Sequence, residues 1–308
     1  MEAVDRETAR LMRLASYASV LVALFLIVLK LGAWWLSGSV SLLTTLVDSL
    51  LDGGASVLSL LAIRHALTPA DDEHRHGHGK VEGLSALAQS AFVAGSGIFL
   101  ALQAVERILS PQALKATEAG IWVMVVSIIT TFALTRFQLY VVKKTGSLAV
   151  EADALHYVGD LLMNVLVIVA LVLVAMTGEA MIDGIIALLL SGFVLFYAFR
   201  ILRKALDMLM DRELPDDERL AIEQDILGHD AVHGVHDLRT RQSGPDRVVQ
   251  CHIELDGKLS LQETYDIMLS IERLVRERHR VIDMIIFPEP ENLKTKWGSR
   301  AVPRNDGT

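Results

Sequence analysis

Two pairs of ionisable side chains, each set four residues apart, lie inside apolar stretches of this 308-residue sequence. The pairs are Asp48 with Asp52 and His156 with Asp160. Because an α-helix has 3.6 residues per turn, this spacing places both members of a pair on one helix face. Each ionisable group costs about 2.5–3.5 kcal/mol at a bilayer centre, so the four are expected to share a partner.

Three carboxylates and one imidazole form a ligand set that suits a divalent transition metal. We therefore expect Asp48, Asp52, His156 and Asp160 to form one site for Zn²⁺, with Cd²⁺, Fe²⁺ and Mn²⁺ as further candidates. The alternative is a set of buried, hydrogen-bonded residues that only hold the helices together. The cost of placing four such groups in a bilayer favours the metal.

The elements that position these residues are apolar segments long enough to cross a membrane. Hydrophobic residues make up 52% of the chain, and its mean hydropathy is +0.41. We expect a six-helix transmembrane transport domain at 1–209, a cytoplasmic domain at 210–293 and a disordered tail at 294–308. A span needs about 20 apolar residues, and the predicted spans are 13–36, 41–63, 84–105, 119–142, 148–176 and 182–202.

The distribution of charge predicts the orientation. Most basic residues near the spans fall on one side, and only Lys30, Arg107 and Lys115 fall on the other. Because basic residues stay on the cytoplasmic side, both termini are expected in the cytoplasm. The net charge of −8 argues against nucleic acid as a partner, and the single cysteine, Cys251, excludes an intramolecular disulfide.

A short internal repeat predicts the depth of the site. Gly38-Ser39-Val40 begins ten residues before Asp48, and Gly146-Ser147-Leu148 begins ten residues before His156. In a six-helix topology the two helices run in opposite directions, which is typical of inverted repeats in transporters. Ten helical residues cover roughly 15 Å, half of the hydrocarbon thickness, so both pairs are expected near the midplane. A repeat this short also arises by chance.

A polar loop between the second and third spans contains another possible metal site. The tract from Pro69 to Lys80 is rich in histidine and acidic residues, as metal-binding tracts often are. Asp71, His74 and His78 are the expected ligands, with His76 as a spare. The alternative is a solvated polar turn.

The C-terminal third has the pattern of a small α/β domain. We predict helix 216–228, strands 233–241 and 247–255, helix 260–279 and strand 281–287, an αββαβ ferredoxin-like order. His252 lies on the polar face of its strand and is expected opposite His236. This histidine pair either binds metal or is only solvated.

Several motifs together resemble one known family. The sequence is similar to the cation diffusion facilitator family, in its bacterial zinc and ferrous-iron efflux branch, over about residues 10–293. The motifs are Trp34-Trp35, Gly38-Ser39-Val40-Ser41, Val47-Asp48-Ser49-Leu50-Leu51-Asp52, Pro69-Ala70-Asp71-Asp72, Gly77-His78-Gly79-Lys80, Ala152-Asp153-Ala154-Leu155-His156 and His236-Asp237-Leu238-Arg239-Thr240-Arg241-Gln242-Ser243-Gly244-Pro245.

The resemblance implies a homodimeric antiporter of the bacterial inner membrane that exports divalent metal from the cytoplasm in exchange for protons. It implies the same four-residue transport site and the same loop site as the residues themselves indicate. It also implies a charge pair, Lys80 with Asp211, that locks the dimer. The metal is then substrate and possible regulatory ligand, and no prosthetic group is expected.

The resemblance further implies a metal site in the cytoplasmic domain, from which this sequence departs. Family members with two ions there carry His-Gln-Asp where this chain has Phe287-Pro288-Glu289, and a further histidine where it has Tyr265. His236, His252 and Glu289 remain as ligands, so at most one ion is expected. Weaker stabilisation of the dimer by metal would follow.

Two other classes of protein compete with a transporter. In a membrane-anchored metal sensor or scaffold, only the cytoplasmic domain would bind metal, and four ionisable residues within the spans argue against it. An intramembrane metalloprotease would need a His-Glu-x-x-His run, which the sequence lacks. We therefore expect no enzyme.

Overall fold

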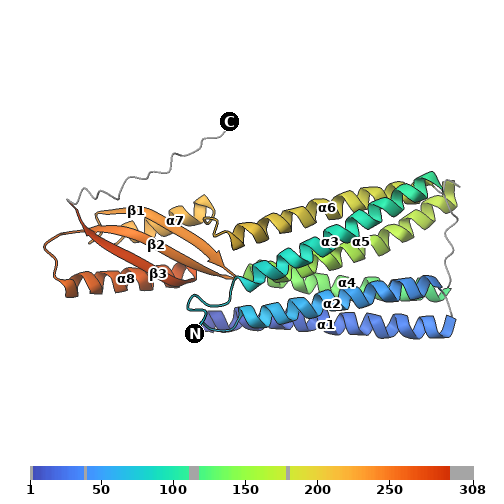
Figure 1. The fold of residues 1–308 in the computed structure, drawn as a ribbon, viewed down its shortest axis with the longest axis horizontal. Coiled ribbons are helices and arrows are strands. Elements are labelled where there is room, and N and C mark those ends of the chain that lie inside the picture. Colours follow the sequence, from blue (N-terminus) through green and yellow to red (C-terminus); the bar gives the residue numbers. More distant parts are fainter. Residues whose placement is uncertain (1–2, 38–39, 111–117, 178–180, 292–308) are drawn as a thin grey trace. The chain divides into compact units, whose positions relative to one another are not determined.

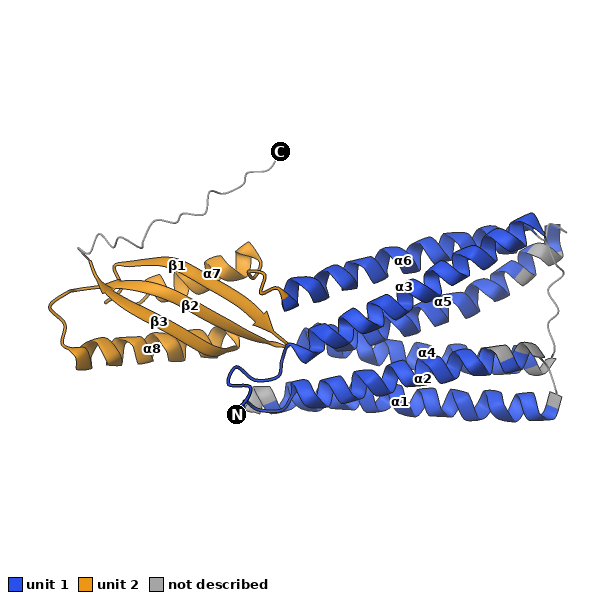
Figure 2. Cartoon of the chain, in the orientation of Figure 1, with its two compact units in different colours: residues 1–209 blue, residues 210–308 orange. Residues whose placement is uncertain are grey.

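The computed structural model describes residues 3–37, 40–110, 118–177 and 181–291. The predicted tail at 294–308 and the first half of the Gly38-Ser39-Val40-Ser41 motif lie outside these ranges. The chain divides into two compact units, residues 1–209 and 210–308 (Figure 2).

The first unit is helical. In the described residues it contains six helices that are long and apolar enough to cross a membrane, as predicted. They extend beyond the predicted apolar segments, because the polar residues that flank these segments are also good helix formers. The helices are α1 (Ala3–Ser37), α2 (Val40–Ala66), α3 (Val81–Leu109), α4 (Glu118–Thr145), α5 (Leu148–Thr177) and α6 (Met181–Leu209).

Small residues allow two of these helices to pack closely. The most extensive helix contact joins α3 to α6, while α1 packs against α2 and α4, and α5 packs against α3, α4 and α6 (Figure 1). Gly184 of α6 lies so close to α3 that an added Cβ would stand 2.6 Å from Ile108 Cγ1. Close approach at small residues is a usual source of helix association in membranes.

The second unit has the predicted αββαβ order, with α7 (Asp216–Leu227), β1 (Gly234–Ser243), β2 (Asp246–Leu255), α8 (Leu261–His279) and β3 (Val281–Pro290). The sheet order is β1-β2-β3, with β1 and β2 antiparallel and β2 and β3 parallel. Gly244, in the turn between β1 and β2, has φ +62°, a conformation that glycine adopts without strain.

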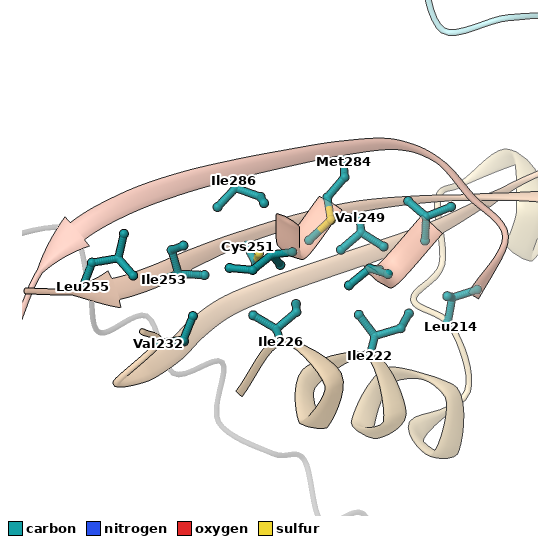
Figure 3. Close-up of a cluster of buried hydrophobic side chains, with 13 residues drawn as sticks. Leu214, Ile222, Ile226, Val232, Val249, Cys251, Ile253, Leu255, Met284 and Ile286 are labelled. Carbon is teal, nitrogen blue, oxygen red and sulfur yellow. The ribbon is translucent and has the colours of Figure 1, made fainter. Parts of the chain in front are cut away.

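One face of the sheet forms the core of this unit (Figure 3). Val249, Cys251, Ile253 and Leu255 alternate along β2 and are all buried, as the sequence pattern predicts. Burial raises the pKa of the Cys251 thiol to about 12. The opposite face of β2 remains available for polar side chains.

Candidate metal centres

Three of the four predicted ligands of the transport site lie together. His156 Nε2 is 2.9 Å from Asp52 Oδ1 and 3.7 Å from Asp160 Oδ2. One ligand atom from each residue lies within 4.8 Å of the others. We call Asp52, His156 and Asp160 the α2–α5 cluster, after the helices that carry it.

The two helices present these residues at matching positions. Asp48 lies eight residues after Val40, where α2 begins, and His156 lies eight residues after Leu148, where α5 begins. Three connections lead from α2 through α3 and α4 to α5, and each reverses the direction of the chain. The helices α2 and α5 therefore run in opposite directions (Figure 1). Equal offsets from opposite ends bring the pairs to a similar depth, as an inverted repeat requires.

Asp48 is not part of the α2–α5 cluster. It lies one helical turn from Asp52 on α2, and it is exposed. A role for Asp48 as a fourth ligand stays a prediction.

Lys30 of α1 is a charged residue near the site that the sequence reasoning missed. Its Nζ donates hydrogen bonds to Ser49 Oγ at 2.6 Å and to the Thr45 carbonyl at 3.2 Å, both on α2. Ser49 immediately follows Asp48, so the ammonium group lies beside the acidic face of α2. The sequence feature that could have indicated this role is the position of a lysine inside an apolar span, Arg6–Leu36.

The loop residues also lie together. Asp71 Oδ1 is 3.4 Å from His74 Nδ1, and Asp71 Oδ2 is 3.4 Å from His78 Nε2. The ring centroids of His74 and His78 are 4.6 Å apart. His78 is 6% exposed, and its Nδ1 is buried without a hydrogen-bond partner. One ligand atom from each of Asp71, His74 and His78 lies within 4.8 Å of the others, an arrangement that a metal ion fits.

The backbone of the loop orients the Asp71 carboxylate. Asp71 Oδ1 accepts hydrogen bonds from the backbone N–H groups of His74 at 2.6 Å and Glu73 at 3.0 Å. The hydrogen bond from the His74 N–H, followed by that from Glu73 and by the charges of the two histidines, lowers the pKa of Asp71. The carboxylate is therefore ionised and positioned without a metal.

In the cytoplasmic unit, His236 and His252 are register partners on β1 and β2, as predicted. His252 Nδ1 is 2.7 Å from Glu289 Oε1, and His236 Nε2 is 3.2 Å from Glu289 Oε2. All three residues are half-buried. One ligand atom from each of the three residues lies within 4.8 Å of the others, so these residues also fit a metal ion.

Two positions at which the resemblance implies further histidines hold other residues. Phe287 stacks on His252, with ring centroids 4.8 Å apart. Tyr265, on α8, is exposed. An apolar ring offers no ligand atom, so one imidazole-rich group of three residues remains.

The predicted charge pair has residues in both units. Lys80 is the N-cap residue of α3. Asp211 Oδ2 lies 3.4 Å from Arg241 Nη1 within the second unit. The pairing of Lys80 with Asp211 stays a prediction.

A six-helix membrane unit with a carboxylate–imidazole cluster between two antiparallel helices, followed by a small α/β unit, defines a class: membrane transporters of metal cations. Comparison with known proteins gives the same class. Residues 16–210 match the family model "Cation efflux transmembrane domain", and residues 214–291 match "Cation efflux protein, cytoplasmic domain". The chain therefore belongs to the cation efflux family.

Two relatives are similar over almost their whole length. The Cation-efflux pump FieF of Pectobacterium carotovorum is 45% identical over 297 residues, which cover 96% of both chains. FieF of Cronobacter sakazakii is 44% identical over 287 residues, which cover 93% of this chain and 95% of the relative. The chain is thus a multi-pass inner-membrane transporter for the efflux of metal cations, and its family is a transporter family.

A solved structure of a CzrB protein in its zinc form is 27% identical. The match covers 28% of this chain and 99% of the solved chain. Its TM-score of 0.25 is too low to compare the two folds.

Proposed function

We propose that this protein exports divalent metal from the cytoplasm in exchange for protons, with Zn²⁺ as the first candidate. The α2–α5 cluster carries this proposal, because it joins one imidazole to two carboxylates inside the membrane unit. Asp48 completes the ligand set when α2 or its side chain adjusts. Affinity order favours Zn²⁺ over Fe²⁺ and Mn²⁺, and Cd²⁺ is a further candidate.

Proton exchange follows from the chemistry of the ligands. His156 must be neutral and the carboxylates ionised to bind metal, so metal binding releases protons. His156 Nε2 and Asp52 Oδ1 lie 2.9 Å apart and share a hydrogen bond, so a metal that binds both atoms must displace its proton. Metal loads from the cytoplasm, helix movement exposes it outside, and protons displace it and return with the empty carrier.

The remaining clusters are proposed as regulatory sites on the cytoplasmic side. We propose that both termini lie in the cytoplasm, which the distribution of basic residues supports. The loop cluster (Asp71, His74 and His78) and the cytoplasmic group (His236, His252 and Glu289) would each bind one ion. The protein is proposed to act as a homodimer that the Lys80–Asp211 pair locks, in a lipid bilayer, with protons as the counter-substrate. We propose transport rather than catalysis.

A membrane-anchored metal sensor is the second candidate. His236, His252 and Glu289 favour it, because they form a metal-binding group outside the membrane helices. A sensor does not need the α2–α5 cluster. A variant without that cluster therefore distinguishes a sensor, which would still work, from a transporter, which would not.

Metal flux into proteoliposomes under an imposed pH gradient tests the proposal, with Zn²⁺, Cd²⁺, Fe²⁺ and Mn²⁺ compared. We expect flux that depends on the gradient in the wild type and none with Asp160→Ala. Asp216→Asn, an exposed carboxylate of the cytoplasmic unit outside the proposed sites, is the control and should keep the flux. Metal binding without flux in the wild type would favour the sensor, and flux that survives Asp160→Ala would sink the proposed site.

A further inference from the structure

A second carboxylate is buried inside the membrane unit, outside the proposed metal ligands. Asp153 of α5 is 2% exposed and accepts hydrogen bonds from Ser19 Oγ and Gln138 Nε2, both at 2.6 Å, with Ser56 Oγ at 3.5 Å. Among the described residues, no Lys, Arg or His side chain forms an ion pair with this carboxylate, taking 4.0 Å as the longest N–O distance of an ion pair. A buried charge with no counter-charge is expensive.

The groups around Asp153 are oxygen-rich and come from four helices. Ser19 Oγ of α1 lies 2.8 Å from Ser56 Oγ of α2, and Ser56 Oγ lies 2.8 Å from the Tyr157 hydroxyl of α5. The Tyr157 hydroxyl also lies 3.4 Å from the Ser19 carbonyl. With Gln138 of α4, these residues form what we call the Asp153 cluster. Hydroxyl groups serve as donors and as acceptors, so the cluster can adapt to either state of the carboxylate.

An unused oxygen lies in the same place. Gln138 is fully buried, and its Oε1 has no hydrogen-bond partner. Thr135, one turn away on α4, and Ser59, one turn from Ser56 on α2, also bury hydroxyl oxygens without a partner. Buried polar atoms are nearly always satisfied, and an amide oxygen can only accept, so Gln138 Oε1 beside Asp153 is an acceptor that a cation could use.

We propose that the Asp153 cluster binds one monovalent cation, a proton or Na⁺, and releases it when metal loads at the α2–α5 cluster. A single carboxylate balances a single positive charge, and the carboxylate and hydroxyl oxygens of the cluster suit a hard cation. The inference rests on the proposed transport function, because it assigns a group that carries the counter-ion.

The release follows from the position of Asp153 on α5. His156 lies three residues further along the helix, so a divalent ion there repels a cation held by Asp153. The other ionisable groups that face the cluster are Tyr157 of α5 and, one turn from Ser56, Asp52 of α2. From α1 and α4 only the neutral side chains of Ser19 and Gln138 contribute contacts, and Arg136 of α4 is exposed.

Calorimetry of Zn²⁺ binding to the purified full-length protein tests this. Titrations in buffers of different ionisation enthalpy count the protons released, and titrations with Na⁺ or choline show any sodium dependence. If the cation is a proton, Asp153→Asn should still bind Zn²⁺ and should release roughly one proton fewer per ion. If the cation is Na⁺, the wild type should bind Zn²⁺ more weakly at high Na⁺, and the variant should not. Asp183→Asn, a buried carboxylate of α6 that pairs with Arg107, is the matched control and should behave as wild type in both.

The inference is overturned if Asp153→Asn matches the wild type in proton release and in sodium dependence. Infrared difference spectra of the wild type with and without Zn²⁺ keep the test valid if that variant does not fold. Loss of a protonated-carboxyl band that shifts in Gln138→Leu, which removes one hydrogen bond to Asp153, or a carboxylate shift that requires Na⁺, supports the inference, and the absence of both overturns it. If the wild type binds no Zn²⁺, the proposed function fails; if it binds Zn²⁺ with neither signal, only this inference fails.

Discussion

At the scale of single residues, Lys30 places a positive charge beside the proposed metal site. Lys30 attracts Asp48, Asp52 and Asp160 electrostatically and is held against α2 by Ser49. Its ammonium group therefore competes with the metal ion for the same negative charge. In an empty carrier it would offset part of that charge while no metal is bound.

Lys30→Gln should tighten metal binding. Removing one positive charge near a divalent ion is worth a few kcal/mol at an effective dielectric near 20, so we expect an affinity at least roughly tenfold higher. Calorimetry of the purified variant measures this. Lys30→Arg keeps the charge and should keep the wild-type affinity. Equal affinities for the glutamine variant and the wild type would mean that the ammonium charge does not reach the metal.

The loop residue Asp71 predicts a pH dependence. Its pKa is lower in the folded loop than in an unfolded chain, chiefly because of the His74 N–H group, so its stabilising contacts are present above the unfolded pKa and are lost as the pH falls through the folded pKa. The nuclear magnetic resonance shift of the His74 amide should therefore titrate with a midpoint below about 3.9, the usual aspartate value. Asp71→Asn should abolish this titration. A midpoint at or above the usual value contradicts the hydrogen bonds described for the loop.

At the scale of elements, local patterns predicted most of the architecture. The six spans and the order of the cytoplasmic unit follow from apolar length and from the change in periodicity near residue 216, and both are confirmed. The pairing of His236 with His252 was predictable because β1 and β2 form a hairpin. The cluster around Asp153 was not, because its partners lie on α1, α2 and α4, up to 134 residues away in sequence. No local pattern encodes such contacts.

The contact between α3 and α6 gives a prediction for these helices. In Gly184→Ala the new Cβ would meet Ile108 Cγ1 at 2.6 Å and the Ala104 carbonyl oxygen at 3.0 Å, and backbone atoms yield little. Overpacking of this kind costs about 1–3 kcal/mol, so the variant should melt at a lower temperature in detergent. Gly192→Ala, on the same helix, meets nothing within 4 Å and should melt as the wild type does. Equal melting of both variants would show that α3 and α6 pack less closely than described.

At the scale of the whole molecule, the division into two units predicts that the cytoplasmic unit folds by itself. Its core contains 13 buried residues, all of them between Leu214 and Ile286, so the core needs no residue of the membrane unit. A fragment covering 210–291 should therefore unfold cooperatively in denaturant, as followed by circular dichroism. Ile253→Ala should lower its free energy of unfolding by about 2–5 kcal/mol, because the side chain is fully buried. Ile282→Ala, a change of the same size at a residue that is 53% exposed on β3, should cost much less. If the fragment were unfolded, the core would depend on the membrane unit or on a second copy of the chain, and the cytoplasmic group could not act as a separate regulatory site.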